Sequence, residues 1–264
     1  MIDPQYPYYR KLQKFLDKKQ VAIYKNLTNK LSLIDSIDFN EVYVLKSSKR
    51  VLVMCYKGGI IKVIFQPSNI YKSELYFSHI LYPIDICSFA SLDGCMMFLP
   101  KYGESLNNCD NEELEKGYEL LERDICSQLM ILHSDFIVHN DIKPSNIVKS
   151  NGLHSKYNWL LIDFGLTETY LPSNPAIISL NSGTKEYNIP NYSKDITELS
   201  ERERTFWMYM KDWYGASKTF CKFNKTIEKL YIYIDNMMKN KVLEILKEFV
   251  DKYKIKSKPY YLMV

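Results

Sequence analysis

The sequence predicts an α+β fold in which a strand-rich first part precedes a helix-rich second part. Three observations support this fold class. Residues 42–65 hold three runs rich in β-branched and aromatic residues, separated by the short polar segments KSSK and KGG. Residues 111–133 place apolar side chains at helical spacing behind an acidic start, which is typical of a capped helix. From about residue 192 onward the patterning is predominantly helical.

Each predicted element follows from its own pattern. In residues 8–35 apolar side chains recur at spacings of three and four among lysines, so we expect one or two amphipathic helices. Such helices commonly cover a packed core with one face, and contact with a membrane surface or a partner is the alternative. The runs in 42–65 are expected to form an antiparallel meander with two hairpin turns. Residues 70–81 are predicted as a helix, and 94–100 as a buried strand.

Composition limits the classes of protein to consider. With 264 residues, 46% of them apolar and 25% charged, the chain has the make-up of a soluble globular protein of one or two domains. The net charge of +4 separates no function classes, and we expect no direct nucleic-acid partner. The six cysteines form no CxxC pair, so we expect reduced thiols and no zinc site.

Targeting signals are also not expected. The sequence has no apolar run of about 18 residues, which a membrane-spanning helix needs. The opening MIDPQYPYYRKL lacks the apolar region of a signal peptide. We therefore expect an intracellular, cytoplasmic protein.

The segment VHNDIKPSNIV, residues 138–148, carries the residues best suited to chemistry. It contains Asp141, Lys143 and Asn146, and LLIDFGL places Asp163 after an apolar strand and before a glycine. Asn146 and Asp163 offer the hard oxygen atoms that Mg²⁺ prefers. Asp141 is then left to receive a proton from an attacking hydroxyl, and Lys143 to neutralise charge on a moving phosphoryl group.

These motifs resemble those of the eukaryotic-type protein kinases. HNDIKPSN resembles the catalytic loop of that family, and DFG is its metal-binding triplet. The resemblance extends over about residues 40–222. It implies a bilobal kinase fold that binds ATP and Mg²⁺ between a β-rich N-lobe (36–101) and an abbreviated helical C-lobe (102–264). Residues 1–35 would form a helical N-terminal extension, and the partner would be a protein substrate.

The same resemblance assigns roles to residues around the nucleotide. Lys62 in IIKVI corresponds to the strand lysine that holds the α- and β-phosphates, and Glu74 to the helix glutamate paired with it. LPKYGESL resembles the hinge between the lobes. There the carbonyl of Pro100 and the N–H of Tyr102 would meet the adenine edge, with Leu99 behind it.

Two later segments extend the likeness toward the substrate side. SGTKEYNIP resembles the substrate-docking segment of the family. Its Thr184 stands where a hydroxyl would bond Asp141 and Lys143. DWYGASKTF resembles the buried helix whose aspartate, here Asp212, braces the backbone of the catalytic loop. We expect His139 to be structural and to pack beneath that loop.

The glycine-rich loop of the family is absent from this sequence. KSSKR stands between the first two predicted strands and contains no glycine. Because glycines let backbone N–H groups approach phosphates closely, we expect weakened or altered nucleotide binding. Lys49 or Arg50 could supply a side-chain contact instead. An alternative registration takes DFNEVY (38–43) as the loop, but it also lacks glycine and leaves Lys62 too far along.

A second departure lies directly before the catalytic aspartate. Asn140 replaces the arginine that makes activity depend on a phosphate in the activation segment, so we predict activity without such phosphorylation. This asparagine and the DWY start resemble baculovirus protein kinases, while GESL resembles casein kinase 1 and the vaccinia-related kinases. The resemblance therefore predicts a compact viral kinase.

The function expected from these features is transfer of the γ-phosphoryl group of ATP to serine or threonine hydroxyls of proteins. The main alternative is a pseudokinase that binds nucleotide or protein without turnover, which the glycine-free loop favours. A further alternative is a small-molecule kinase related to the aminoglycoside phosphotransferases, which share a similar loop but lack the SGTKEYNIP docking segment. The sequence carries no signal for an oligomeric state.

Overall fold

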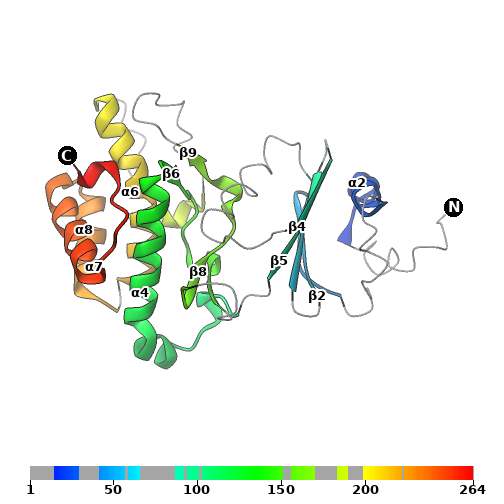
Figure 1. The fold of residues 1–264 in the computed structure, drawn as a ribbon, viewed down its shortest axis with the longest axis horizontal. Coiled ribbons are helices and arrows are strands. Elements are labelled where there is room, and N and C mark those ends of the chain that lie inside the picture. Colours follow the sequence, from blue (N-terminus) through cyan, green and yellow to red (C-terminus); the bar gives the residue numbers. More distant parts are fainter. Residues whose placement is uncertain are drawn as a thin grey trace. The chain divides into compact units, whose positions relative to one another are not determined.

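The computed structural model contains both helices and strands, as the α+β prediction requires (Figure 1). The chain divides into two compact units: the first comprises Met1–His79 and Pro83–Tyr102, and the second comprises Ile80–Tyr82 and Gly103–Val264. None of the helices in the described stretches is long and apolar enough to cross a membrane. The structure describes residues 15–29, 42–56, 59–65, 87–91, 94–100, 103–150, 156–169, 183–189, 199–221 and 223–263.

The first unit contains an antiparallel sheet with the strand order β1-β2-β3-β5-β4. The meander predicted for 42–65 is confirmed, and β5 spans the seven residues predicted for the buried strand. No pattern in the sequence predicted β4, and the helix predicted at 70–81 lies outside the described residues. The strands are β1 (Tyr43–Ser47), β2 (Val51–Tyr56), β3 (Gly59–Ile64), β4 (Cys87–Ser91) and β5 (Gly94–Pro100).

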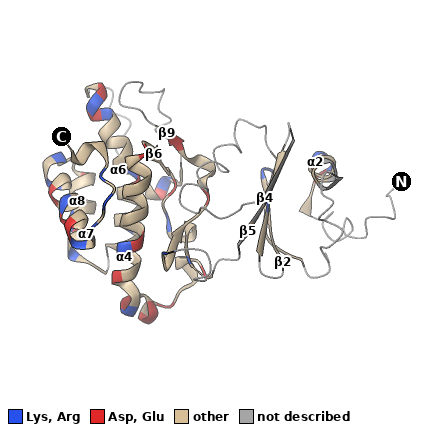
Figure 2. Ribbon diagram, in the orientation of Figure 1, with Lys and Arg blue, Asp and Glu red and all other residues tan. Residues whose placement is uncertain are grey.

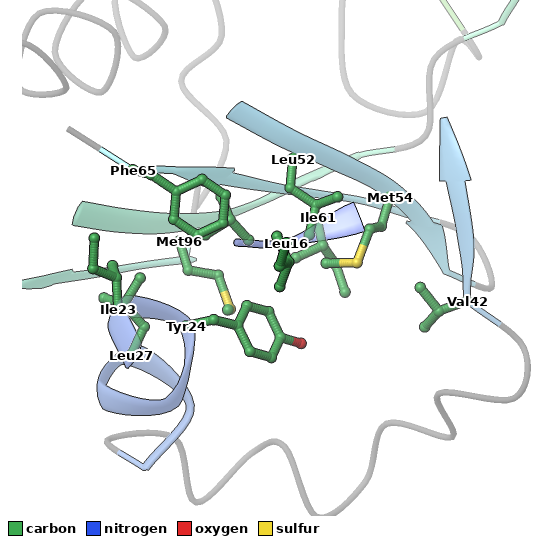
Figure 3. Close-up of a cluster of buried hydrophobic side chains, with 11 residues drawn as sticks. Leu16, Ile23, Tyr24, Leu27, Val42, Leu52, Met54, Ile61, Phe65 and Met96 are labelled. Carbon is green, nitrogen blue, oxygen red and sulfur yellow. The ribbon is translucent and has the colours of Figure 1, made fainter. Parts of the chain in front are cut away.

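Helix α2 (Lys18–Asn29) covers one face of this sheet. Ile23, Tyr24 and Leu27 on its apolar side pack into one hydrophobic cluster with sheet residues such as Met96 (Figure 3). Gly94 allows the close approach, because a Cβ there would lie 2.7 Å from the Ile23 side chain. The apolar face of this amphipathic helix therefore packs into the core, which agrees with the expectation that such a helix covers a core with one face.

The second unit combines helices with two small two-stranded sheets, in which β6 pairs with β9 and β7 with β8. Helices α4, α6, α7 and α8 pack against one another (Figure 1). The helices are α4 (Asn111–Ser134), α6 (Glu201–Phe220), α7 (Lys225–Asp235) and α8 (Lys239–Tyr253). The strands are β6 (Ile137–Val138), β7 (Ile147–Lys149), β8 (Trp159–Leu161) and β9 (Glu168–Thr169).

Side-chain caps explain where the two long helices begin. Asp110 accepts a hydrogen bond from the N–H of Glu112 at the start of α4. At the start of α6, Ser200 and Glu203 form a capping box in which each side chain bonds the backbone of the other. Basic and acidic residues both occur along α7 and α8, and most of them are exposed, so these helices present a surface of mixed charge (Figure 2).

The middle of α6 is buried on all sides. Trp213, Tyr209 and Tyr214 are among its fully buried side chains. A helix whose residues are buried around its whole circumference lies inside a core rather than on its surface. Helix α6 matters for the site because its Asp212 bonds the loop that follows β6.

Candidate active site

The motif VHNDIKPSNIV forms the connection between β6 and β7. The connection ends in the short 3-10 helix η5 (Pro144–Asn146), which begins with proline as helices commonly do. The N–H of Ile162, just after β8, donates to the carbonyl of Asn146 at 2.9 Å. Asp163 is the next residue, so the strand pairing brings it near the end of the loop.

The carboxylate of Asp141 accepts hydrogen bonds from three other residues. Its Oδ2 accepts from Nζ of Lys143 at 2.6 Å and from Nδ2 of Asn146 at 3.0 Å. Its Oδ1 accepts from the backbone N–H of Thr184 at 2.9 Å and from the hydroxyl at 2.7 Å. Nζ of Lys143 also donates to Oγ1 of Thr184 at 2.8 Å. The contacts expected of Thr184 with Asp141 and Lys143 are therefore present.

This environment keeps Asp141 ionised. Burial alone would raise the pKa of Asp141, but hydrogen bonds from Lys143 and Thr184, together with the lysine charge, hold it below its usual value. A carboxylate that is ionised at neutral pH can accept the proton of a hydroxyl group. The adjacent ammonium group can stabilise negative charge that develops on a transferred group.

Asn146 and Asp163 are the residues predicted to hold a metal ion, and this role stays a prediction. Nδ2 of Asn146 donates to the backbone carbonyl and to the carboxylate of Asp141. These bonds use the amide nitrogen, so Oδ1 is the Asn146 atom suited to coordinate a cation. Asp163 adopts the left-handed conformation with φ of 68°. Among the described residues, no group of three or more His, Cys, Asp or Glu side chains is arranged to hold a metal. An amide oxygen and a carboxylate nevertheless fit the ligand preference of Mg²⁺.

The surroundings of His139 agree with the structural role expected of it, because the residue is fully buried. Its Nε2 lies 3.1 Å from the carbonyl of Ile162 and therefore carries the proton, because a carbonyl only accepts. Its Nδ1 accepts from the N–H of Asp141 at 3.3 Å. Burial holds the pKa of His139 below its usual value, which favours this neutral tautomer. The ring also packs against that of Phe164, with centroids 4.9 Å apart.

Asp212 braces the catalytic loop from α6. One carboxylate oxygen accepts from the N–H of His139 at 2.7 Å, and the other accepts from the N–H of Asn140 at 2.8 Å. Asp212 is only 1% exposed, so both bonds lie in the interior. The role expected of Asp212 as a brace agrees with this geometry.

The residues that hold Asp212 in place were not predicted from the sequence. Nε1 of Trp213 donates to the hydroxyl of Tyr261 at 3.1 Å, and that hydroxyl lies 2.7 Å from Nδ1 of His133. Because an indole N–H only donates, the Tyr261 proton can point to Nδ1. Nε2 of His133 then donates to Asp212 at 3.1 Å. Tyr261 is 128 residues from His133 in sequence, and no local pattern indicates their contact.

Two glycines allow the backbone to approach this loop closely. Gly215 on α6 faces the catalytic loop, and a Cβ there would lie 2.5 Å from the carbonyl oxygen of Ile142. Gly183 has a positive φ of 95°, and a Cβ there would overlap the carbonyl oxygen of Asn140. Gly183 directly precedes Thr184, so this close approach sets where the Thr184 hydroxyl meets Asp141.

Replacing Gly183 by alanine is expected to destabilise the site. The left-handed conformation and the overlap with Asn140 together should cost about 1–3 kcal/mol, which thermal unfolding can measure. Gly117→Ala is the matched control. Gly117 lies inside α4 with nothing within 4 Å of the added Cβ, and this change should stabilise by about 0.5–1 kcal/mol. Equal melting temperatures for the two variants would contradict the proposed packing.

Lys62 lies in the first unit, on β3, where it is opposite Met97 of β5. It is 7% exposed. Its neighbours Ile61 and Val63 belong to the cluster beneath α2, so strand alternation places Lys62 on the opposite face of the sheet. A lysine among apolar strand residues is unusual, and its role in holding phosphates stays a prediction.

The expected adenine contacts are only partly described. Leu99 packs against the cluster of Ile64, Cys95 and Met97, and Pro100 is the last residue of β5. Their contact with a nucleotide stays a prediction. Two further predicted residues, Glu74 and Tyr102, lie outside the described residues.

The side chain of Ser48 closes the glycine-free hairpin between β1 and β2. Oγ of Ser48 accepts from the N–H groups of Arg50 and Val51, at 3.2 and 3.1 Å. Nε2 of Gln20 on α2 donates to the carbonyl of Ser48 at 2.9 Å. Two N–H groups that a glycine-rich loop would offer to phosphates are thus already bonded here.

Comparison with known proteins gives partial matches to protein kinases. Myosin light chain kinase 3 of Homo sapiens is 37% identical over 108 residues, 39% of this chain and 13% of that protein. The L-type lectin-domain containing receptor kinase V.7 of Arabidopsis thaliana is 30% identical over 125 residues, 46% of this chain and 16% of that protein. The Proline-rich receptor-like protein kinase PERK10 of the same plant is 38% identical over 78 residues, 28% of this chain and 10% of that protein.

No family model matches the chain. The chain covers 10% to 16% of the length of the three relatives, and the matched segments are less than half of this chain. Within that extent, the similarity supports a protein-kinase-like transferase.

Proposed function

We propose that this protein is an ATP-dependent protein kinase with the bilobal kinase fold, which transfers the γ-phosphoryl group to serine or threonine hydroxyls. The observation that carries the proposal is the Asp141 carboxylate. It is ionised, bonded to Lys143, Asn146 and Thr184, and held on a loop that a buried aspartate braces. The partial matches to protein kinases support the same reaction class.

Catalysis would rest on placement and charge, with no covalent enzyme intermediate. Asp141 would orient the protein hydroxyl and accept its proton. Lys143, bonded to Asp141 at 2.6 Å, would neutralise negative charge that develops as the phosphoryl group moves. The two groups are held in place before the substrate arrives, so the reaction requires little reorganisation.

Nucleotide and metal would be held by the remaining predicted residues. Asn146 and Asp163 would bind Mg²⁺, which screens the charge of the phosphates when it is bound. Lys62, paired with Glu74, would orient the α- and β-phosphates. Leu99, Pro100 and Tyr102 would contact the adenine, and these assignments rest on the resemblance of their motifs.

A protein hydroxyl is the favoured acceptor because of Thr184. Its hydroxyl donates to Asp141 and accepts from Lys143, which links the predicted docking segment to the catalytic residues. Aminoglycoside-type small-molecule kinases have no such segment. The bridge between lysine and threonine also matches the serine/threonine branch of the protein kinases, and the viral lineage remains a prediction from the motifs.

Phosphate transfer from radiolabelled ATP tests the proposal. The purified protein is incubated with Mg²⁺ and a generic acceptor such as casein, and in parallel its melting temperature is followed as ATP and Mg²⁺ are added. Label on serine or threonine of the acceptor, lost when Mg²⁺ is chelated, is the expected result. No transfer under conditions where ATP stabilises the protein would favour the second candidate.

That second candidate is a pseudokinase, and the β1–β2 hairpin is the observation that favours it. Because Ser48 already bonds the N–H groups of Arg50 and Val51, this hairpin offers phosphates fewer backbone donors than a glycine-rich loop. Weak nucleotide binding is expected under either candidate. Turnover distinguishes them.

Activity is expected not to require phosphorylation. Asn140 cannot bind a phosphate as an arginine does, so treatment with a phosphatase should change the rate by less than about twofold. The phosphatase is removed before the assay, and mass spectrometry verifies dephosphorylation. A fall of more than about tenfold, restored by autophosphorylation, would contradict the prediction.

A further inference from the structure

A buried lysine on α6 lies against the catalytic loop and has no place in the mechanism above. Lys211 is 3% exposed. Its Nζ donates to Oδ1 of Asn140 at 3.0 Å. Asn140 is the residue directly before Asp141, and it holds a positive φ of 67°. A buried ammonium group requires compensation, so this position calls for an explanation.

The lysine fixes how the Asn140 amide is oriented. An ammonium group can only donate, so the atom facing Lys211 has to be the amide oxygen. Nδ2 is then directed to the carbonyl of Leu166 at 3.0 Å and to Oε2 of Glu168 at 3.4 Å. Asn140 therefore connects α6 on one side with the segment that follows Asp163 on the other.

Two carboxylates favour the charged form of Lys211, against the effect of its burial. Burial lowers the pKa of Lys211, while Asp212 and Glu168 act in the opposite direction and favour the charged form. Glu168 lies in β9, opposite Val138 of β6. The positive charge thus lies where the catalytic loop, α6 and β9 meet, and each carboxylate comes from a different one of these packed elements.

We infer that Lys211 is a positioning residue that joins the catalytic loop to the segment following Asp163 through its hydrogen bond to the Asn140 amide. The inference rests on the proposed function, and it extends that function to regulation. The phosphate-dependent kinases of the resembled family use an arginine before the catalytic aspartate and a phosphate added later. Here an asparagine, a lysine from α6 and Glu168 make the connection from the chain itself.

The geometry gives the mechanism of this effect. Asn140 adjoins Asp141, and Leu166 is three residues from Asp163. Fixing the Asn140 amide between Lys211 and Leu166 therefore fixes the base and the metal ligand relative to each other. Because these two groups must act on one phosphoryl group, small errors in their spacing reduce the rate strongly.

Kinetics of Lys211→Met are the first test. Methionine keeps the apolar length of the side chain and removes the charge and the donor. We expect kcat to fall at least about tenfold while KM for ATP stays within about twofold, because ground-state binding is not the part affected. Lys247→Met, on the exposed side of α8, is the matched control and should leave both constants unchanged.

A double-mutant cycle separates the charge pair from general destabilisation. Lys211→Met leaves Glu168 without its compensating charge, so adding Glu168→Gln should restore about threefold or more of the lost kcat. If the losses of kcat in Lys211→Met and Glu168→Gln simply added in the double variant, the two substitutions would have unrelated structural effects, and the inference would be overturned.

Hydrogen exchange provides a readout that needs no activity. Amides in 137–141 and 166–169 should exchange about tenfold faster in Lys211→Met than in the wild type or in Lys247→Met. If the wild type transferred no phosphate, the proposed function would fail, and the exchange comparison would still decide the role of Lys211. Unchanged exchange in both segments would overturn the inference whatever the activity.

Discussion

Asp141→Asn is expected to reduce phosphate transfer by about 10²–10⁴-fold, because the substitution removes the proposed proton acceptor. It also disturbs the network. Lys143, Asn146 and Thr184 donate all four hydrogen bonds that the Asp141 carboxylate accepts. An asparagine there has one oxygen, and its NH₂ group has to face donors. The rate is measured with radiolabelled ATP under single-turnover conditions.

The control for this substitution comes from the same part of the chain. Asp135 lies in the exposed turn after α4, and Asp135→Asn removes a negative charge without touching the network. Its rate should equal that of the wild type. Melting temperatures of both variants are recorded, so that lost activity is not confused with lost fold. A wild-type rate for Asp141→Asn at an unchanged melting temperature would defeat the assignment of Asp141 as the base.

Much of the first unit could be predicted from the sequence because its signals are local. The runs in 42–65 have strand composition and short polar turns, and they form the predicted meander. Strand β4 (Cys87–Ser91) escaped prediction because CSFAS contains only one bulky residue. Its place in the sheet is given by pairing with β5, which a local pattern does not record.

The candidate site was predictable to the extent that its residues lie close in sequence or in a known motif. Asp141, Lys143 and Asn146 fall within six residues of one another, and the structure joins them in one network. Thr184 is 43 residues from Asp141, and only the resemblance of its segment indicated the contact.

The residues that hold the catalytic loop in place could not be predicted, because packing between segments far apart in the sequence brings them together. Lys211 meets Asn140 across 71 residues, and His133 meets Tyr261 across 128. Each of these side chains has an ordinary sequence context. A lysine on a helix usually indicates a solvated face, and only the burial of α6 makes Lys211 exceptional.

Asp212→Ala is expected to have the largest effect on stability. The carboxylate accepts from the N–H groups of His139 and Asn140 and from His133. Truncation leaves these buried donors unsatisfied, at about 1–3 kcal/mol for each, and removes the compensating charge near Lys211. We therefore expect a loss of about 3–5 kcal/mol, which lowers the melting temperature by about 10 °C for a chain of this size.

Two further variants show how much of the stability lost in Asp212→Ala comes from the lost hydrogen-bond acceptors and how much from removing a carboxylate as such. Asp212→Asn keeps one acceptor oxygen and the shape of the side chain, so it should cost less than the alanine variant while still disturbing the loop. Asp251→Ala removes an exposed carboxylate from α8 and should change stability by less than about 0.5 kcal/mol. Chemical denaturation of the three variants gives the comparison. If Asp212→Ala unfolded at the same denaturant concentration as Asp251→Ala, the catalytic loop would have to be held by something other than α6, and the positions inferred for Asp141 and Lys211 would lose their common support.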